Sequence, residues 1–360
     1  MGRFRTGLFF LRNQSDKIRK SRHSSPEQIS LKSVIHYLRK RRPNANYSLE
    51  FIFEDVRRRL EGFCKIKSHV APHESSGVFA RLLILWDVFR VRSENIHVTG
   101  DINFAVLGTR RQSAVLTMLD CGFMNRSKGF RRWILKYLWL RWPVKWSACT
   151  TTISQSAKDE IIDWSGCNPE KVVVIPVAIS EGFTSRPREF DRSNPRILHI
   201  GTAPNKNLGR HIEAVRGLEC TLVVLGVIDE NNLRTLQEHN IRFENHVELT
   251  LDEVIGQYAR ADLLCFASTH EGFGMPILEA HATGRPVVTS NISSMPEVAG
   301  DAALFVDPLN VEEIRSAILR ICDEPELRDQ LILKGFDNVK RFNPEEIARQ
   351  YYEVYRRVWG

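Results

Sequence analysis

Residues 261–268 read Ala-Asp-Leu-Leu-Cys-Phe-Ala-Ser, residues 269–275 read Thr-His-Glu-Gly-Phe-Gly-Met, and residues 276–290 read Pro-Ile-Leu-Glu-Ala-His-Ala-Thr-Gly-Arg-Pro-Val-Val-Thr-Ser. The first run is almost continuously apolar, which is typical of a short strand buried on both faces. Pro276 suits the first turn of a helix and Gly284 suits its C-terminal cap, after which residues 287–290 start another strand. Residues 269–275 are therefore predicted to form a loop at the carboxyl edge of a parallel sheet, where open α/β sheets bind ligands.

This loop combines groups that suit an anion with groups that suit hydroxyls. Gly272 and Gly274 let the backbone approach a ligand closely and adopt positive φ angles, and the following helix offers free N–H groups to a phosphate. Glu271 lies in the loop and Glu279 lies about one turn into the helix. A carboxylate beside a diphosphate is repulsive unless it accepts hydrogen bonds, and sugar hydroxyls are natural donors. A nucleotide-sugar supplies both the diphosphate and the hydroxyls. For one glutamate alone, an ordinary acidic residue near a helix N-terminus is the simpler interpretation; the combined spacing favours the ligand site.

The segment that starts at Glu271, Glu-Gly-Phe-Gly-Met-Pro-Ile-Leu-Glu-Ala, closely resembles the E-x7-E signature of retaining family-4 glycosyltransferases. The resemblance continues to Pro308 and is weaker, but traceable, from about residue 34 onward. It implies an α/β protein with the GT-B fold, in which two Rossmann-like parallel-sheet domains face a central cleft.

The same resemblance organises the rest of the chain. Residues 31–182 are expected to form the acceptor domain and residues 196–343 the donor domain, joined by an aperiodic linker at 183–195. Residues 344–360 are expected to form a helix that returns to the first domain, and residues 1–30 a mobile basic extension. Residues 152–156 are expected to close the first sheet, with Ser156 and Asp159 capping the helix that follows.

The composition bounds the class of protein. A chain of 360 residues is long enough for two domains, and no run approaches the ~18 to 20 apolar residues of a transmembrane helix. Seven cysteines at irregular spacing predict reduced thiols in a cytoplasmic protein. The formal net charge of +8 suits an anionic partner, such as a nucleotide, a phospholipid surface or a nucleic acid. With the nucleotide-sugar motif present, we expect no nucleic acid.

Residues 125–149 interleave Lys and Arg with Trp, Phe and Leu. Two interpretations are open. Basic amphipathic helices with Trp at the boundary often lie on anionic membranes, which predicts peripheral attachment to the cytoplasmic face of the inner membrane. Alternatively, the segment is a helix packed on the sheet with a solvated basic face.

The resemblance assigns roles to individual residues. Glu279 would hold the ribose hydroxyls, and Glu271 would hold the hexose or help to set Lys206. Lys206 would neutralise the leaving diphosphate, where charge develops in the transition state. The remaining residues expected at the donor site are Gly201, Thr202, Gly272, Phe273, Gly274, Met275 and Pro276, with the N–H groups of residues 272–274 on phosphate or sugar oxygens.

Two positions depart from the family. Thr202 stands where an Arg is common, and Leu119 stands where a His ordinarily contacts the donor sugar. Asp120, the residue after it, is kept and is expected to be catalytic together with Lys206 and Glu271. No Asp-x-Asp occurs in the chain, so neither a metal nor another cofactor is expected.

The predicted activity is a retaining transfer of a hexosyl or deoxyhexosyl group from a nucleoside-diphosphate sugar, and GDP-mannose is the first candidate donor. The predicted acceptor is a glycan or lipid-linked glycan hydroxyl in surface polysaccharide assembly. Because no side-chain nucleophile is evident, front-face displacement is expected. Two alternatives stay open: a catalytically weak homologue that scaffolds a glycan-assembly complex, and a GT-B nucleotide-sugar epimerase.

Overall fold

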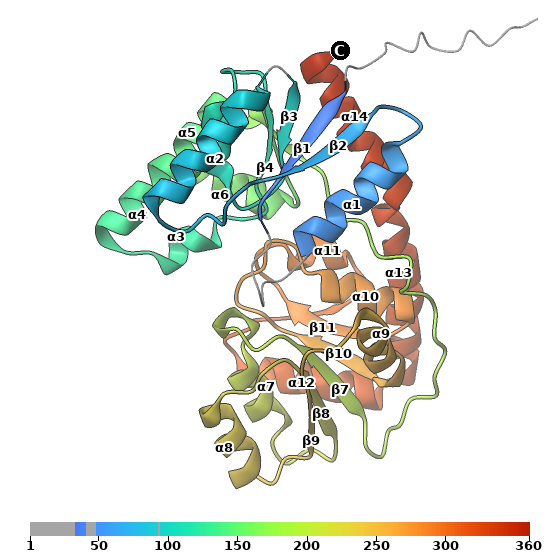
Figure 1. The fold of residues 1–360 in the computed structure, drawn as a ribbon. Coiled ribbons are helices and arrows are strands. Elements are labelled where there is room, and N and C mark those ends of the chain that lie inside the picture. Colours follow the sequence, from blue (N-terminus) through green and yellow to red (C-terminus); the bar gives the residue numbers. More distant parts are fainter. Residues whose placement is uncertain (1–32, 41–47, 93) are drawn as a thin grey trace, which may run out of the picture.

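The computed structural model describes residues 33–40, 48–92 and 94–360. Within them, the chain folds into two halves, each built on a six-stranded sheet whose strands run parallel (Figure 1). The predicted pair of parallel sheets is therefore confirmed.

The first sheet has the order β2-β1-β3-β4-β5-β6. Its strands are β1 (Val34–Leu38), β2 (Ile66–Val70), β3 (Asn95–Val98), β4 (Val115–Thr117), β5 (Cys149–Thr152) and β6 (Val172–Val174). The larger helices around it are α1 (Ser48–Leu60), α2 (Gly77–Val91) and α6 (Gln155–Ser165). The shorter helical segments are η1 (Asn103–Gly108), which precedes β4, and four segments that follow β4: α3 (Gly122–Arg126), α4 (Gly129–Leu135), the π-helical turn η2 (Lys136–Arg141) and α5 (Trp142–Trp146).

The second sheet has the order β12-β11-β10-β7-β8-β9. Its strands are β7 (Arg196–Ile200), β8 (Thr221–Leu225), β9 (Phe243–His246), β10 (Leu263–Phe266), β11 (Val287–Ser290) and β12 (Leu304–Val306). Its helices are α7 (Leu208–Val215), α8 (Glu230–Glu238), α9 (Leu251–Arg260), α10 (Met275–Thr283), α11 (Met295–Ala299), α12 (Val311–Asp323) and α13 (Pro325–Val339). Every residue of β10 and β11 is buried, as the apolar run predicts.

The last helix, α14 (Pro344–Trp359), lies against α1 of the first half. The Tyr355 hydroxyl lies 2.8 Å from His36 Nε2 and 2.8 Å from His97 Nδ1. All three side chains are fully buried, and burial lowers the pKa of His97 to about 3. A polar bond network thus ties the end of the chain to the centre of the first sheet. The exact domain boundaries stay a prediction.

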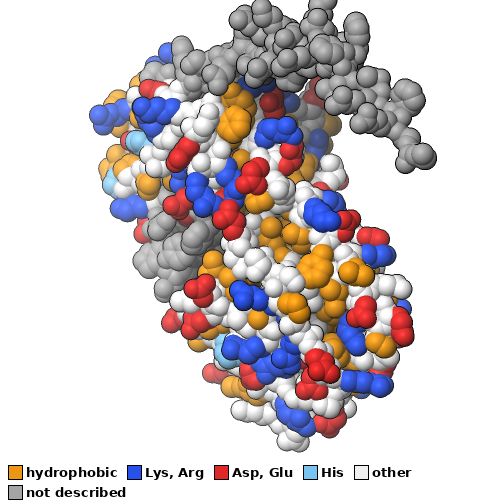
Figure 2. All heavy atoms as spheres, turned by 90° about the vertical axis from the view of Figure 1, so that its right-hand side faces the viewer, with side chains coloured by type: hydrophobic (Ala, Val, Ile, Leu, Met, Phe, Trp, Pro, Cys, Tyr) orange, Lys and Arg blue, Asp and Glu red, His pale blue; other side chains and the backbone are white. Residues whose placement is uncertain are grey.

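Figure 2 shows the side of the molecule that lies at right in Figure 1, where α13 and α14 run. Lysine and arginine side chains are interspersed there with aspartate and glutamate. Arg59 of α1, for example, pairs with Glu345 of α14 and with Glu181. Positive charge therefore does not dominate this face.

The expectation for residues 152–156 is wrong in detail. β5 ends at Thr152, and β6 lies outside it as the edge strand. Ser154, not Ser156, caps α6, because it keeps an extended backbone and its hydroxyl accepts a hydrogen bond from Ala157 N at 3.1 Å. The basic extension expected at residues 1–30 lies outside the described residues.

No helix in the described ranges is long and apolar enough to cross a membrane. All seven cysteines are unpaired thiols.

Candidate active site

The loop after β10 lies at the carboxyl edge of the second sheet and leads directly into α10. Gly274 is the residue before this helix and has a φ of 111°, which a side chain would disfavour. Gly272 does not share this positive φ, so that part of the prediction is wrong. Position 272 requires glycine because there is little room for a side chain: a Cβ there would lie 3.0 Å from Asp120 Oδ2.

The loop carbonyls are held by serine hydroxyls. Ser293 and Ser294 both donate to Glu271 O, at 2.7 and 2.9 Å. Ser294 also donates to the carbonyl of residue 273 at 2.6 Å, and Ser154 of the first half donates to Gly272 O at 2.7 Å. The N–H groups of residues 272–274, by contrast, donate to no atom of the described chain. The backbone therefore presents donors and no free acceptors at the start of α10, which suits an anion.

Lys206 lies in the neighbouring loop, at the end of the short turn Pro204–Lys206 that follows β7. Its Nζ is 2.7 Å from Glu271 Oε1 and lies 4.8 Å above the ring centroid of Phe266. Its aliphatic stem rests on Gly201, where a Cβ would meet Lys206 Cγ at 3.0 Å. Gly201 also has a φ of 85°. The structure thus brings together three residues that the sequence placed at the donor site.

Asn205 joins the two loops, and sequence reasoning missed it. Its Nδ2 donates to His270 O at 2.9 Å and lies 3.4 Å from Glu271 Oε1. Its own carbonyl accepts from Thr269 N at 2.8 Å. Thr202, the departure from the family, lies instead against the end of β8, with its side chain 3.2 Å from the Cβ position of Gly226. Met275 and Pro276 form the first turn of α10.

Glu279 accepts a hydrogen bond from the Tyr258 hydroxyl at 2.5 Å. Tyr258 comes from α9 and is fully buried. Burial raises the pKa of Glu279 to about 7, against the opposing effects of the Tyr258 hydrogen bond and the Lys206 charge. Nothing in the sequence pattern marked Tyr258, because its 21-residue separation from Glu279 spans a helix, a strand and a loop.

The first half supplies the opposite wall of the predicted donor site. Asp120 follows β4, and its Oδ1 accepts from Gly122 N at 2.8 Å while its Oδ2 faces Gly272. Leu119 is partly buried and packs against the apolar core. The Leu119 side chain is thus turned toward the core.

Sequence reasoning also missed a contact between the two halves, which joins His270 to Glu160. His270 Nε2 lies 2.7 Å from Glu160 Oε1 of α6, and Glu160 Oε2 accepts from Cys121 N at 3.2 Å. The Glu160 hydrogen bond, aided by the charges of Glu160, Asp120 and Glu271, raises the pKa of His270. An imidazole therefore lies between the two walls although Leu119 has replaced the histidine expected there.

Among the described residues, no group of three or more His, Cys, Asp or Glu side chains is placed to hold a metal ion. Metal independence stays a prediction.

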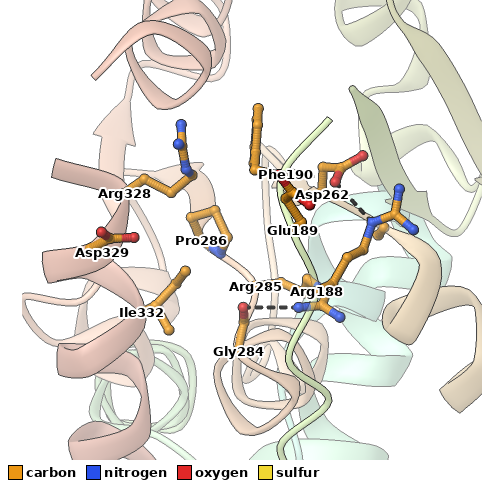
Figure 3. A pocket seen from close by; sticks show the side chains of 11 residues that line it. Arg188, Glu189, Phe190, Asp262, Gly284, Arg285, Pro286, Arg328, Asp329 and Ile332 are labelled. Atoms are coloured by element: carbon orange, nitrogen blue, oxygen red, sulfur yellow. Dashed lines mark hydrogen bonds and ion pairs between the residues drawn. The ribbon is translucent and has the colours of Figure 1, made fainter. Parts of the chain in front are cut away.

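A separate pocket lies at the opposite edge of the second sheet, before β10 and β11 (Figure 3). Two of its charged side chains, those of Asp262 and Arg285, are bonded within the chain. Asp262 accepts from Arg188 at 3.0 Å and from Arg196 N at 2.8 Å. Arg285 donates to four backbone carbonyls, including that of Arg186 in the linker. Arg285 thus holds the linker in place, and the pocket lies away from the predicted donor site.

Comparison with known proteins agrees with this fold. The chain matches a sucrose-phosphate synthase structure from Thermosynechococcus elongatus with a TM-score of 0.74 at 14% identity, covering 91% of this chain and 99% of that one. It matches WaaG, a glycosyltransferase involved in lipopolysaccharide biosynthesis, with a TM-score of 0.69 at 14% identity, covering 89% and 99%. The chain therefore has the GT-B fold of glycosyltransferases.

Residues 194–324 match the family model Glycosyl transferases group 1. O-antigen chain mannosyltransferase B of Escherichia coli is 30% identical over 231 residues, which are 57% of this chain and 59% of that protein. The MMP alpha-(1->4)-mannosyltransferase of Mycolicibacterium hassiacum is 30% identical over 227 residues, 58% and 53% of the two chains. The match thus spans less than two thirds of either relative. Residues 194–324 are a glycosyl transferases group 1 domain, consistent with the family-4 signature.

Proposed function

We propose that this protein is a retaining glycosyltransferase that moves a hexosyl or deoxyhexosyl group from a nucleoside-diphosphate sugar to a hydroxyl of a glycan or lipid-linked glycan. One observation carries the proposal. The Lys206–Glu271 pair lies beside the open N–H groups of residues 272–274, with Glu279 one turn along α10 and Asp120 on the facing wall.

Each part of this arrangement has a role toward the donor. The N–H groups and the Lys206 ammonium would bind the diphosphate and stabilise the charge that develops as it leaves. Glu279 would accept hydrogen bonds from the ribose. Glu271 is already held by Lys206 and Asn205, so it would present its carboxylate to the hexose in a fixed position.

The reaction would take place on one face of the sugar. The bond from the anomeric carbon to the phosphate oxygen breaks, and the bond to the acceptor oxygen forms on the same side. The departing phosphate takes the acceptor proton, so no protein nucleophile and no metal are required. Asp120 and His270 lie at the wall from which the acceptor would approach.

The names of the relatives favour a mannosyl donor and a role in polysaccharide assembly. Two of them are O-antigen chain mannosyltransferases, one from Escherichia coli and one from Salmonella typhimurium. We therefore take GDP-mannose as the first donor to test. The unpaired cysteines support a cytoplasmic site for the reaction.

A thermal-shift panel of GDP-, UDP-, ADP- and dTDP-sugars on the purified protein tests donor binding, and release of free nucleoside diphosphate tests transfer. Release that requires an acceptor supports the proposal. Donor binding without turnover would instead indicate a scaffolding homologue, which Leu119 and Thr202 motivate. An epimerised donor formed without acceptor would indicate an epimerase.

A further inference from the structure

The outer face of α2 is apolar and uncovered. Val78, Phe79, Leu82, Trp86 and Phe89 are each between 42% and 75% exposed. Their spacing places them on one side of the helix, while Ile84 and Val88 on the other side are fully buried in the core. Trp86 and Phe89 also stack on each other with ring centroids 5.6 Å apart. Single exposed apolar residues are common on protein surfaces, but a continuous exposed face on one helix is not.

A second apolar row runs along α4, η2 and α5. Phe130, Trp133, Tyr137 and Trp142 contact one another in sequence, with centroid distances of 5.8, 5.0 and 6.0 Å. Phe130 is 74% exposed, and Trp133 and Trp142 are about half exposed. These rings form an aromatic row on the surface.

The helices that carry the two rows, α2 and α4–α5, lie on the same flank of the first half, at left in Figure 1 and away from α14. The helical segments that carry the two rows contact each other where the Arg81 guanidinium of α2 lies 4.6 Å from the ring centroid of Trp139 in η2. We call this the aromatic flank, comprising the exposed residues of α2 and of α4–α5 just named. It differs from the surface expected at residues 125–149, because Leu140 and Val144 are buried and Trp146 donates to Thr109 O.

The α4–α5 part of the aromatic flank is also basic. No Asp or Glu occurs between Asp120 and Asp159, a stretch that carries the exposed side chains Lys128, Arg131, Arg141 and Lys145. At the C-terminal end of α2, the guanidinium of the capping residue Arg92 lies 3.7 Å from the Phe89 ring centroid. This flank thus contrasts with the face of mixed charge in Figure 2.

We propose that the aromatic flank is a docking surface for an anionic lipid bilayer. Aromatic side chains with a polar edge favour the headgroup region, and neighbouring Lys and Arg side chains are attracted to anionic lipid. A second copy of this chain fits poorly, because a twofold contact would bring the same basic residues face to face. The inference stands independently of the proposed reaction.

The position of the flank adds a consequence for the acceptor, which does rest on the proposed function. α3 begins at Gly122, beside Asp120 in the wall of the predicted site, and α4 follows it directly. A bilayer docked on the flank would therefore lie near the entrance from the first half, where a lipid-linked acceptor would arrive.

Vesicle flotation tests the docking surface. The full chain should float with phosphatidylcholine vesicles that contain phosphatidylglycerol, much less with phosphatidylcholine alone, and should be released by raised salt. Phe79→Ser/Trp86→Ser on α2 and Phe130→Ser/Trp133→Ser on α4 should each lower the partition coefficient at least about tenfold, since each removes two large apolar side chains from the contact. Lys128→Glu/Arg131→Glu should lower it by more than tenfold, because each basic residue near the surface contributes about fivefold.

The matched control is Val227→Ser/Leu333→Ser, which removes two equally exposed apolar side chains from the second half. It should bind vesicles as the parent does. Thermal unfolding shows that each variant is folded, and all the altered side chains are exposed, so folding should survive. Equal recovery with neutral vesicles, or wild-type binding by both aromatic variants, would overturn the proposal. So would self-association in the absence of lipid that the same variants abolish, because a second copy would then be the occupant.

Discussion

The hydrogen bond from Tyr258 to Glu279 should set the pH range in which the donor binds. Tyr258→Phe removes the hydroxyl at 2.5 Å and nothing else from a fully buried ring. In the wild type the pKa of Glu279 is about 7, so the carboxylate that would accept ribose hydrogen bonds is half ionised near neutral pH. Donor affinity should therefore rise as the pH increases through 7.

The size of the effect follows from the bond that is lost. A hydrogen bond to a charged group contributes about 1.5–3 kcal/mol, and one pKa unit corresponds to about 1.4 kcal/mol. Because the bond stabilises the ionised form, its loss should raise the pKa of Glu279 by about 1 to 2 above its wild-type value. Donor affinity at pH 7 should then fall about five- to fiftyfold and recover most of the loss by about pH 9.

Isothermal titration calorimetry with GDP-mannose across this pH range measures the effect. Tyr37→Phe is the matched control, since it removes a tyrosine-to-carboxylate bond of 2.9 Å to Asp87 in the first half. Its pH profile should match the wild type. If the Tyr258→Phe profile also superimposes on the wild type in a folded protein, Tyr258 does not set the ionisation of Glu279 and the reasoning is refuted.

Five further outcomes are expected. Lys206→Ala should lower turnover at least ~100-fold. The control Lys334→Ala breaks an exposed ion pair of α13 and should leave turnover within a few-fold of the wild type. Equal effects of the two substitutions would show that Lys206 is an ordinary surface charge. Activity should survive excess EDTA, and a loss that added Mn²⁺ restores would contradict metal independence. Deoxyhexose donors should be used at least as well as their hydroxylated parents, because Leu119 cannot donate a hydrogen bond; a clear preference for the hydroxylated sugar would mean that Leu119 only packs. Tyr355→Phe should lower the free energy of unfolding by about 1–3 kcal/mol in urea titrations. In the parent, stability should fall as the pH drops below 6.5, because the unfolded chain then binds a proton that buried His97, with a pKa of about 3, does not; equal stability at pH 7.5 and 5 would contradict this.

Local chemistry made part of this molecule predictable. The strand–loop–helix unit around α10 could be read from the sequence because a buried parallel strand is continuously apolar, and because Pro276 and Gly284 mark the helix ends. The capping box of α9 is equally local, with Thr250 and Glu253 bonded to each other's backbone. In these cases the determining residues lie within a few positions of one another.

The missed features depend on contacts across long separations. Glu160 meets His270 across 110 residues, and no local pattern pairs them. β9 and β12 carry only weak local signals, since β9 is polar and β12 contains only three residues. The exposed face of α2 was missed for a different reason: an apolar helix reads as core until the packing shows which side is uncovered.

The bond between Tyr355 and the two buried histidines has a consequence for the order in which the protein matures during synthesis. Tyr355 is made 258 residues after His97 and 319 residues after His36. While the ribosome is still translating the second half, the centre of the first sheet lacks its hydroxyl partner and the helix that covers it. The N-terminal domain of a multidomain protein usually folds first. Here the first half should complete its folding after the second half. The nascent second half can close its own core, and the first half stays open until α14 has emerged and docked.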